Sequence, residues 1–146
     1  MSNITHKSAT VSRLLLGLIF FVFGLNGFLG FIPQPPMPDA AAAFVGGLAS
    51  SGYFFPLLKG TEVLAGIALL SNRYVPLALA VLAPISINIF LFHLVLAPGV
   101  GLSVVIIATQ AFLAWVHKDA YAKLLTAKSE LPAVTAHVAS GAPSHA

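Results

Sequence analysis

Four long apolar segments, separated by short polar or proline-rich stretches, dominate the pattern of the chain. They cover residues 14–32, 54–70, 75–96 and 102–116. A helix that crosses the hydrocarbon core of a bilayer needs about 20 predominantly apolar residues, and the four segments are near this length. The pattern therefore predicts an all-α fold, an integral membrane four-helix bundle that occupies residues 14–121.

The stretches between the segments predict how the spans are joined. Proline fixes φ and lacks an N–H donor, so the sequence PQPPMP at 33–38 is expected to end the first span. Asp39 stands where an N-cap would, ahead of a short helix at 40–48 that we expect at the membrane interface. The polar turn at 71–73 is so short that the second and third spans should be antiparallel neighbours.

The first apolar segment also has features of a secretory signal peptide. A basic start, an apolar run and small residues at 40–43 follow one another in the right order. The apolar run is long, however, and the stretch that follows it is unusually rich in proline. We therefore expect a membrane span here.

Composition supports a protein that lies within the lipid bilayer. Hydrophobic residues make up 58% of the chain and charged residues 8%, whereas a soluble domain is about 25% charged; the mean hydropathy is +0.96. Cysteine is absent, which excludes disulfides and Cys-ligated clusters, so a redox role would need a bound cofactor. The basic residues are scattered rather than clustered, which argues against nucleic acid as a partner.

The distribution of Lys and Arg predicts the orientation of the spans. Apart from Lys59, the basic residues fall on one side of the predicted topology: Lys7, Arg13, Arg73, Lys118, Lys123 and Lys128. The loops at 33–52 and 97–101 contain neither Lys nor Arg. Cytoplasmic loops carry an excess of these residues, so residues 1–13 and the C-terminal tail at 122–146 should both be cytoplasmic. The composition of the tail predicts disorder.

Lys59 and Glu62 are two charged residues inside the otherwise apolar second span. A charged side chain near the middle of a spanning helix costs about 2.5–3.5 kcal/mol on insertion scales, so such residues are usually paired, turned inward and functional. A spacing of three places both on one helix face. The pair is therefore the main candidate for a functional site, and a structural ion pair that fixes helix rotation is the alternative.

The other spans also carry polar residues: Asn26, Asn88, His93 and Gln110. The predicted topology places Asn26, Lys59 and Asn88 at similar depths in the half of the membrane away from the cytoplasm. Glu62 and Gln110 would lie nearer the midplane. All four spans can thus contribute to one buried polar cluster, provided that each polar face is turned inward.

Several of these residues have structural alternatives. The amides of Asn26, Asn88 and Gln110 can hydrogen-bond across helices and serve packing alone. His93 has no second ligand at metal spacing, so we assign no metal site and expect proton exchange near the outer surface. No nucleotide-binding or hydrolase motif occurs, and no catalytic residue is assigned.

Three segments resemble the DoxX family of small four-helix membrane proteins: RLLLGLIFFVFGLNGFLGFIPQPPMP at 13–38, GYFFPLLKGTEVLAGIALLSNRYVPLAL at 52–79 and LAPISINIFLFHLVLAP at 82–98. The K-x-x-E of Lys59 and Glu62 and the N-x-x-x-x-H of Asn88 and His93 are its sharpest marks. The resemblance implies a four-span bundle in the bacterial inner membrane. It also implies an association with redox proteins, because the family takes its name from a subunit of quinol-oxidising and thiosulfate-oxidising complexes.

Three functions follow from these observations. The first is an accessory subunit of a membrane redox complex that binds a quinone at the buried polar site and is not an enzyme by itself. The second is a small transporter or proton pathway, which would need a homo-oligomer because four short helices leave little room for a pore. The third is a scaffold or assembly factor in which the polar residues only rigidify the bundle.

Overall fold

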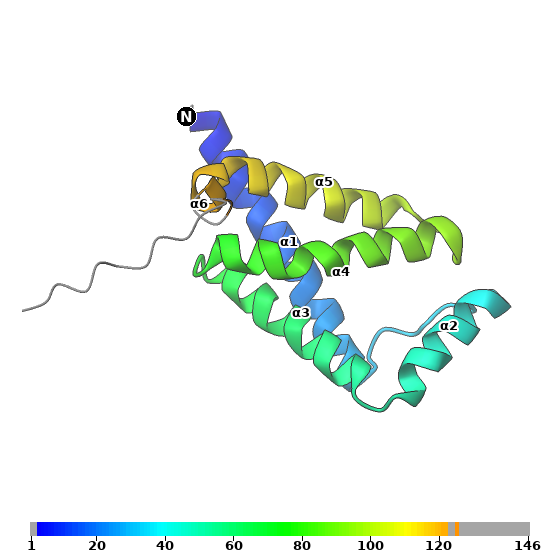
Figure 1. The fold of residues 1–146 in the computed structure, drawn as a ribbon. Helices are drawn as coiled ribbons and strands as arrows, with labels where there is room; N and C mark the ends of the chain where they lie inside the picture. The colour runs from blue at the N-terminus through cyan, green and yellow to red at the C-terminus, as the bar shows by residue number, and fades with distance from the viewer. Residues whose placement is uncertain (1–2, 123–124, 126–146) are drawn as a thin grey trace, which may run out of the picture.

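Helices form all of the regular secondary structure in the described part of the chain, residues 3–122 and 125 of a computed structural model. They are α1 (Asn3–Leu29), α2 (Asp39–Ser50), α3 (Phe54–Leu70), α4 (Val75–Val95), α5 (Gly101–Val116) and α6 (Lys118–Ala122) (Figure 1). The all-α fold class is thereby confirmed.

Two of the described helices, α1 and α4, are long and apolar enough to cross a membrane. α2 and α3 qualify together as one broken span, bent by 92° at the residues between them. α5 is apolar but has 16 residues. At about 1.5 Å per residue it is about 24 Å long, less than the hydrocarbon core of about 30 Å. The described part of the chain thus contains two to three helical segments suited to spanning a membrane.

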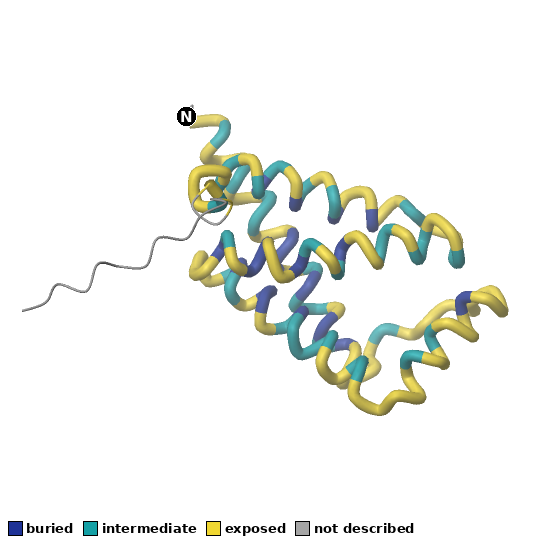
Figure 2. The backbone as a smooth tube through the Cα atoms, in the orientation of Figure 1, coloured by how far each residue is buried: buried dark blue, intermediate teal, exposed yellow. Residues whose placement is uncertain are grey.

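Large apolar side chains cover the outside of the fold as well as its centre. Leu64 of α3 and Val95 of α4, for example, are 70% and 73% exposed, and Figure 2 shows exposed stretches along every helix. Exposed large apolar side chains also occur on α1, α2 and α5, and an extensive apolar surface is unusual on a soluble monomer. Such a surface is stable when hydrocarbon surrounds it, which agrees with the spanning helices.

α1 and α3 form the closest helix pair, because glycines let their backbones approach. A Cβ atom at Gly66 of α3 would lie 2.7 Å from the backbone nitrogen of Phe21 on α1. About one turn further along α1, a Cβ atom at Gly24 would lie 2.9 Å from the backbone nitrogen of Val63, an earlier residue of α3. The two helices are therefore antiparallel, and the last turns of α1 lie beside the first turns of α3.

α3, α4 and α5 follow one another as neighbours, and α1 packs on both α3 and α5 (Figure 1). The turn between α3 and α4 is tight, with Asn72 and Tyr74 in the left-handed region at φ 58° and 53°. The core between the helices is mainly leucine, with one large aromatic ring: Leu16, Phe20, Leu69, Leu79, Leu82, Ile106 and Leu113.

α1 ends three residues before Ile32, the predicted boundary of the first span. Gly30 follows the helix with φ 61°, and its backbone N–H donates to Asn26 O at 2.8 Å. A glycine in the left-handed conformation is a common helix terminator, because it has no Cβ to strain. Gly30 therefore ends α1 ahead of the prolines, which were expected to do so.

α2 takes the place of the short helix expected at 40–48 and turns sharply away from α3 (Figure 1). Asp39 is its first residue and not its N-cap, since Pro38 holds that position without a side-chain cap. The ring centroids of Phe44 on α2 and Phe92 on α4 lie 6.1 Å apart. Of the predicted tail, Ala122 ends α6, and most of the remainder lies outside the described residues.

Candidate functional site

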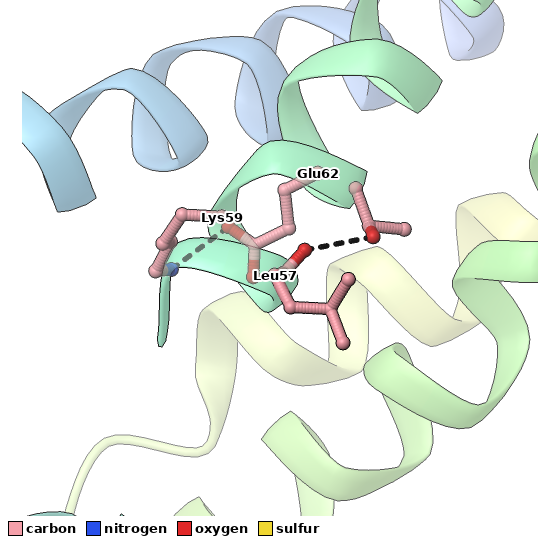
Figure 3. Close-up of polar contacts among 4 residues, drawn as sticks. Leu57, Lys59 and Glu62 are labelled. Carbon is pink, nitrogen blue, oxygen red and sulfur yellow. Dashed lines mark hydrogen bonds and ion pairs between the residues drawn. The ribbon is translucent and has the colours of Figure 1, made fainter. Parts of the chain in front are cut away.

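Lys59 and Glu62 lie one turn apart on the same face of α3, and their side chains meet. Lys59 Nζ donates to Glu62 Oε2 at 2.8 Å (Figure 3). The spacing of three residues is enough to form this contact, because it places both side chains on one face. Pairing offsets part of the cost of holding two charges in apolar surroundings.

The two charged groups differ in how far a ligand can reach them. The side chain of Glu62 is 2% exposed, whereas that of Lys59 is 22% exposed. An ammonium group carries three N–H donors, and among the described residues Glu62 is its one hydrogen-bond partner. Lys59 therefore presents unused donors at the edge of an otherwise apolar helix pair.

Small residues on α1 make room for the ion pair. The aliphatic stem of Lys59 lies directly over Gly27, where a Cβ atom would come within 2.6 Å of Lys59 Cδ. Nearer the centre of α1, a Cβ atom at Gly24 would lie 3.1 Å from Glu62 Cβ. Larger residues at these two positions would compete with the pair for space, so α1 determines where the ammonium group lies.

Asn26 is buried on α1, but its side chain stabilises the end of its own helix. Its Oδ1 accepts a hydrogen bond from the backbone N–H of Ile32 at 2.6 Å. In the described structure no hydrogen bond joins Asn26 to Lys59 or Glu62. Asn26 thus shapes the chain after α1 and does not contribute to the ion pair.

Gln110 belongs to a second buried polar contact, between α4 and α5. Its Nε2 donates to the carbonyl oxygen of Leu79 at 2.8 Å, and its Oε1 accepts from the hydroxyl of Ser86. Both side chains are buried, at 7% exposed for Gln110 and 1% for Ser86. Ser86 was not among the predicted residues, because a small hydroxyl within an apolar segment gives little signal.

Asn88 and His93 bond within their own helix. Asn88 is exposed, and its Nδ2 donates to Pro84 O at 2.9 Å. His93 Nδ1 lies 2.9 Å from Ile89 O. Within the described part of the chain, no group of three His, Asp or Glu residues is placed to hold a metal ion.

The six predicted residues therefore do not form one polar cluster. Lys59 and Glu62 form one site between α1 and α3, and Gln110 forms another between α4 and α5. The five-residue spacing of Asn88 and His93 offsets them by roughly 140° around a helix, and each contacts a backbone carbonyl of its own helix. The shared cluster is the part of the site prediction that the geometry contradicts.

Arg13 links α1 to α3 by hydrogen bonds. The charge pattern of the sequence indicates only a topology signal at this residue. Its Nη1 donates to the carbonyl oxygens of Leu69 and Leu70 at the end of α3. Basic side chains near a helix C-terminus commonly satisfy its last carbonyls. A contact across more than fifty residues leaves no local trace in the sequence.

An apolar groove of about 280 Å³ lies between α3 and α4, and Thr61 and Ala65 are among the residues that line it. Thr61 lies two residues from Lys59, which is about 200° around the helix. Neither Lys59 nor Glu62 lines the groove. A molecule bound to the ammonium group would therefore lie on the α1 side of α3, with its apolar part in the surrounding lipid.

No protein-family model matches the chain, and neither do any curated proteins or solved structures. The resemblance to the DoxX family therefore stays a prediction. What the site does chemically has to be argued from its own residues, chiefly from the accessible lysine and the enclosed carboxylate.

Proposed function

We propose that the protein is an accessory subunit of a membrane redox complex and that it holds the polar head of a quinone at Lys59. In this proposal α1, α3, α4 and α5 are the four spans, and both termini lie on the cytoplasmic side of a bacterial inner membrane. The apolar outer surface supports the spans, and the grouping of Lys and Arg supports the orientation.

The partial exposure of Lys59 carries the proposal. Glu62 is enclosed and uses one donor of the ammonium group, and the remaining donors point to no described partner. In hydrocarbon an unsatisfied donor costs several kcal/mol. A carbonyl oxygen from an apolar ligand would satisfy it, and a quinone offers such an oxygen on a molecule that already dissolves in the bilayer.

The roles of the two charged residues follow from this geometry. Lys59 donates to a carbonyl oxygen of the head group, and Glu62 keeps the ammonium in place. The Glu62 carboxylate can also accept a proton from the ammonium as Lys59 receives one from the bound head group. The proposal assigns no part in this site to Asn26, Asn88, His93 or Gln110, because among the described residues none of them is hydrogen-bonded to Lys59 or Glu62.

The test compares the wild type with the double variant Lys59→Met with Glu62→Leu. The double variant removes the donors without leaving a buried charge unpaired. Lipid extracts of protein purified in mild detergent are analysed by mass spectrometry, and a short-chain quinone is titrated into both proteins. We expect quinone in the wild type and its loss from the double variant, with Thr61→Val as a control on the other face of α3. A wild type free of quinone, with no binding on titration, refutes the proposal.

A scaffold or assembly factor is the second candidate, and the glycine contacts favour it. Gly24 and Gly27 pack directly against the ion pair, as expected if the pair fixes how α1 and α3 are rotated. A scaffold predicts that the double variant keeps the amount and activity of the assembled complex. Loss of activity with normal assembly would instead support the ligand site.

A further inference from the structure

A polar cavity of about 270 Å³ opens at the end of the fold where α1 begins and α5 ends. His6 and Arg13 of α1, His117 at the end of α5 and Asn72 of the turn between α3 and α4 line it. These three segments meet at the end near the marked N-terminus in Figure 1. None of the described residues that line the cavity is acidic.

The donors in this cavity are held in place by the surrounding backbone. Arg13 uses Nη1 to bond the last carbonyls of α3, and the guanidinium has five N–H donors in a rigid fork, so others remain for a ligand. His117 also lines the cavity, and the contact of its Nδ1 with Leu113 O at 2.8 Å does not use its Nε2. The His117 ring and the Arg13 guanidinium thus line the same cavity.

The cavity is separate from the ion pair on α3. Arg13 precedes Gly27, the residue under Lys59, by 14 positions on α1, which corresponds to about 21 Å along the helix. Trp115, which directly precedes the cavity-lining Val116, is 59% exposed. Exposed tryptophan is enriched where membrane meets water, as expected for a cavity at the depth of lipid head groups.

We infer that this cavity binds a phosphate-type oxyanion, either the head group of an anionic lipid or a free phosphate. Arg forks match phosphate oxygens in pairs, and an anion stabilises the charged form of a neighbouring imidazole. The volume of about 270 Å³ is large enough to hold such a group.

Two probes separate the sources of the phosphate group. Protein in a maltoside detergent is titrated with inorganic phosphate and followed by its thermal unfolding. In a second experiment phosphatidylglycerol is added and bound lipid is counted by native mass spectrometry, with diacylglycerol as the lipid without phosphate. Binding of phosphate alone assigns a soluble anion, and binding of phosphatidylglycerol alone assigns a lipid.

Variants test whether the cavity is the binding site. His6→Gln with His117→Gln should weaken binding of the phosphate-bearing probe by roughly tenfold or more, since charge-assisted hydrogen bonds are lost. Arg13→Gln should weaken binding of the same probe. If Arg13→Gln unfolds, the double variant His6→Gln with His117→Gln still tests the site. Arg73→Gln removes a charge at the same end without lining the cavity and should have no effect. Failure of both probes to bind, or equal weakening by Arg73→Gln, overturns the inference.

Discussion

Gly27 of α1 lies under the aliphatic stem of Lys59 on α3, so closely that a Cβ atom there would come within 2.6 Å of Lys59 Cδ. The substitution Gly27→Ala should therefore displace the lysine. Because strain from overpacking costs about 1–3 kcal/mol, we expect a loss of unfolding free energy in this range, measured in detergent micelles. In a Lys59→Ala background the same change should cost less, because Cγ and Cδ are gone and only the contact with Cβ of residue 59 at 3.1 Å remains. An equal cost in both backgrounds would show that Lys59 is not the cause.

Two glycines on α3 provide a matched comparison. Gly66→Ala would bring a Cβ atom to 2.7 Å from the backbone nitrogen of Phe21, whereas a Cβ atom at Gly60 meets nothing within 4 Å. We expect Gly66→Ala to destabilise the protein by about 1–3 kcal/mol. Gly60→Ala should be neutral or stabilise by up to about 1 kcal/mol, since alanine favours the helix. If Gly60→Ala proved as costly as Gly66→Ala, the α1–α3 contact would not explain the effect.

The ion pair predicts a strong departure from additivity. Lys59→Met leaves the enclosed carboxylate of Glu62 without its partner, and Glu62→Leu leaves the ammonium likewise. Each single change should lower the unfolding free energy by about 3–5 kcal/mol, whereas the double change should be nearly neutral. Thermal unfolding of all four proteins in one detergent measures this. Two small single effects that simply add would mean that water or lipid already compensates each charge.

The sequence was sufficient for the features that depend on local spacing. The all-α class followed from the long apolar segments, and the contact between Lys59 and Glu62 followed from a separation of three on a helix. The residue that ends α1 is also a matter of local sequence. Gly30 ends the helix, although the prolines that follow it are the stronger signal in the sequence.

The sequence could not predict which polar residues come together in one site, because this depends on how each helix is rotated about its axis. Asn88 and Gln110 occupy similar polar positions in apolar segments, yet Asn88 is exposed and Gln110 is buried against Ser86. Polar character alone does not say which face of a helix meets its neighbours. The same is true of Arg13, whose partners lie on another helix far along the chain.

The contact of Ser86 with Gln110 should stabilise the packing of α4 on α5. Ser86→Ala removes the hydroxyl that donates to Gln110 Oε1. This buried oxygen then loses its hydrogen-bond donor. We expect a loss of about 1–2 kcal/mol, in keeping with hydrogen bonds between membrane helices. Ser71→Ala is the control, because that hydroxyl is exposed and bonds only to Ala68 O of the preceding helix. Equal losses for the two variants, measured by unfolding in micelles, would assign no special role to the buried contact.

Tyr121 of α6 should make stability depend on pH in the alkaline range. Its hydroxyl donates to Pro76 O at 2.8 Å, and burial raises its pKa above the usual 10.0. The folded state thus favours the neutral phenol, so this contribution is complete below about pH 10 and is lost as pH rises through the raised pKa. Tyr121→Phe should lower the free energy of unfolding by about 1 kcal/mol at neutral pH, and this deficit against the wild type should shrink in alkali.

Comparing the two proteins removes the titration of lysines, which is common to both. Tyr53→Phe, at an exposed site, should show neither effect, and a Tyr121→Phe deficit that is constant from about pH 8 to about pH 11 would contradict the assignment.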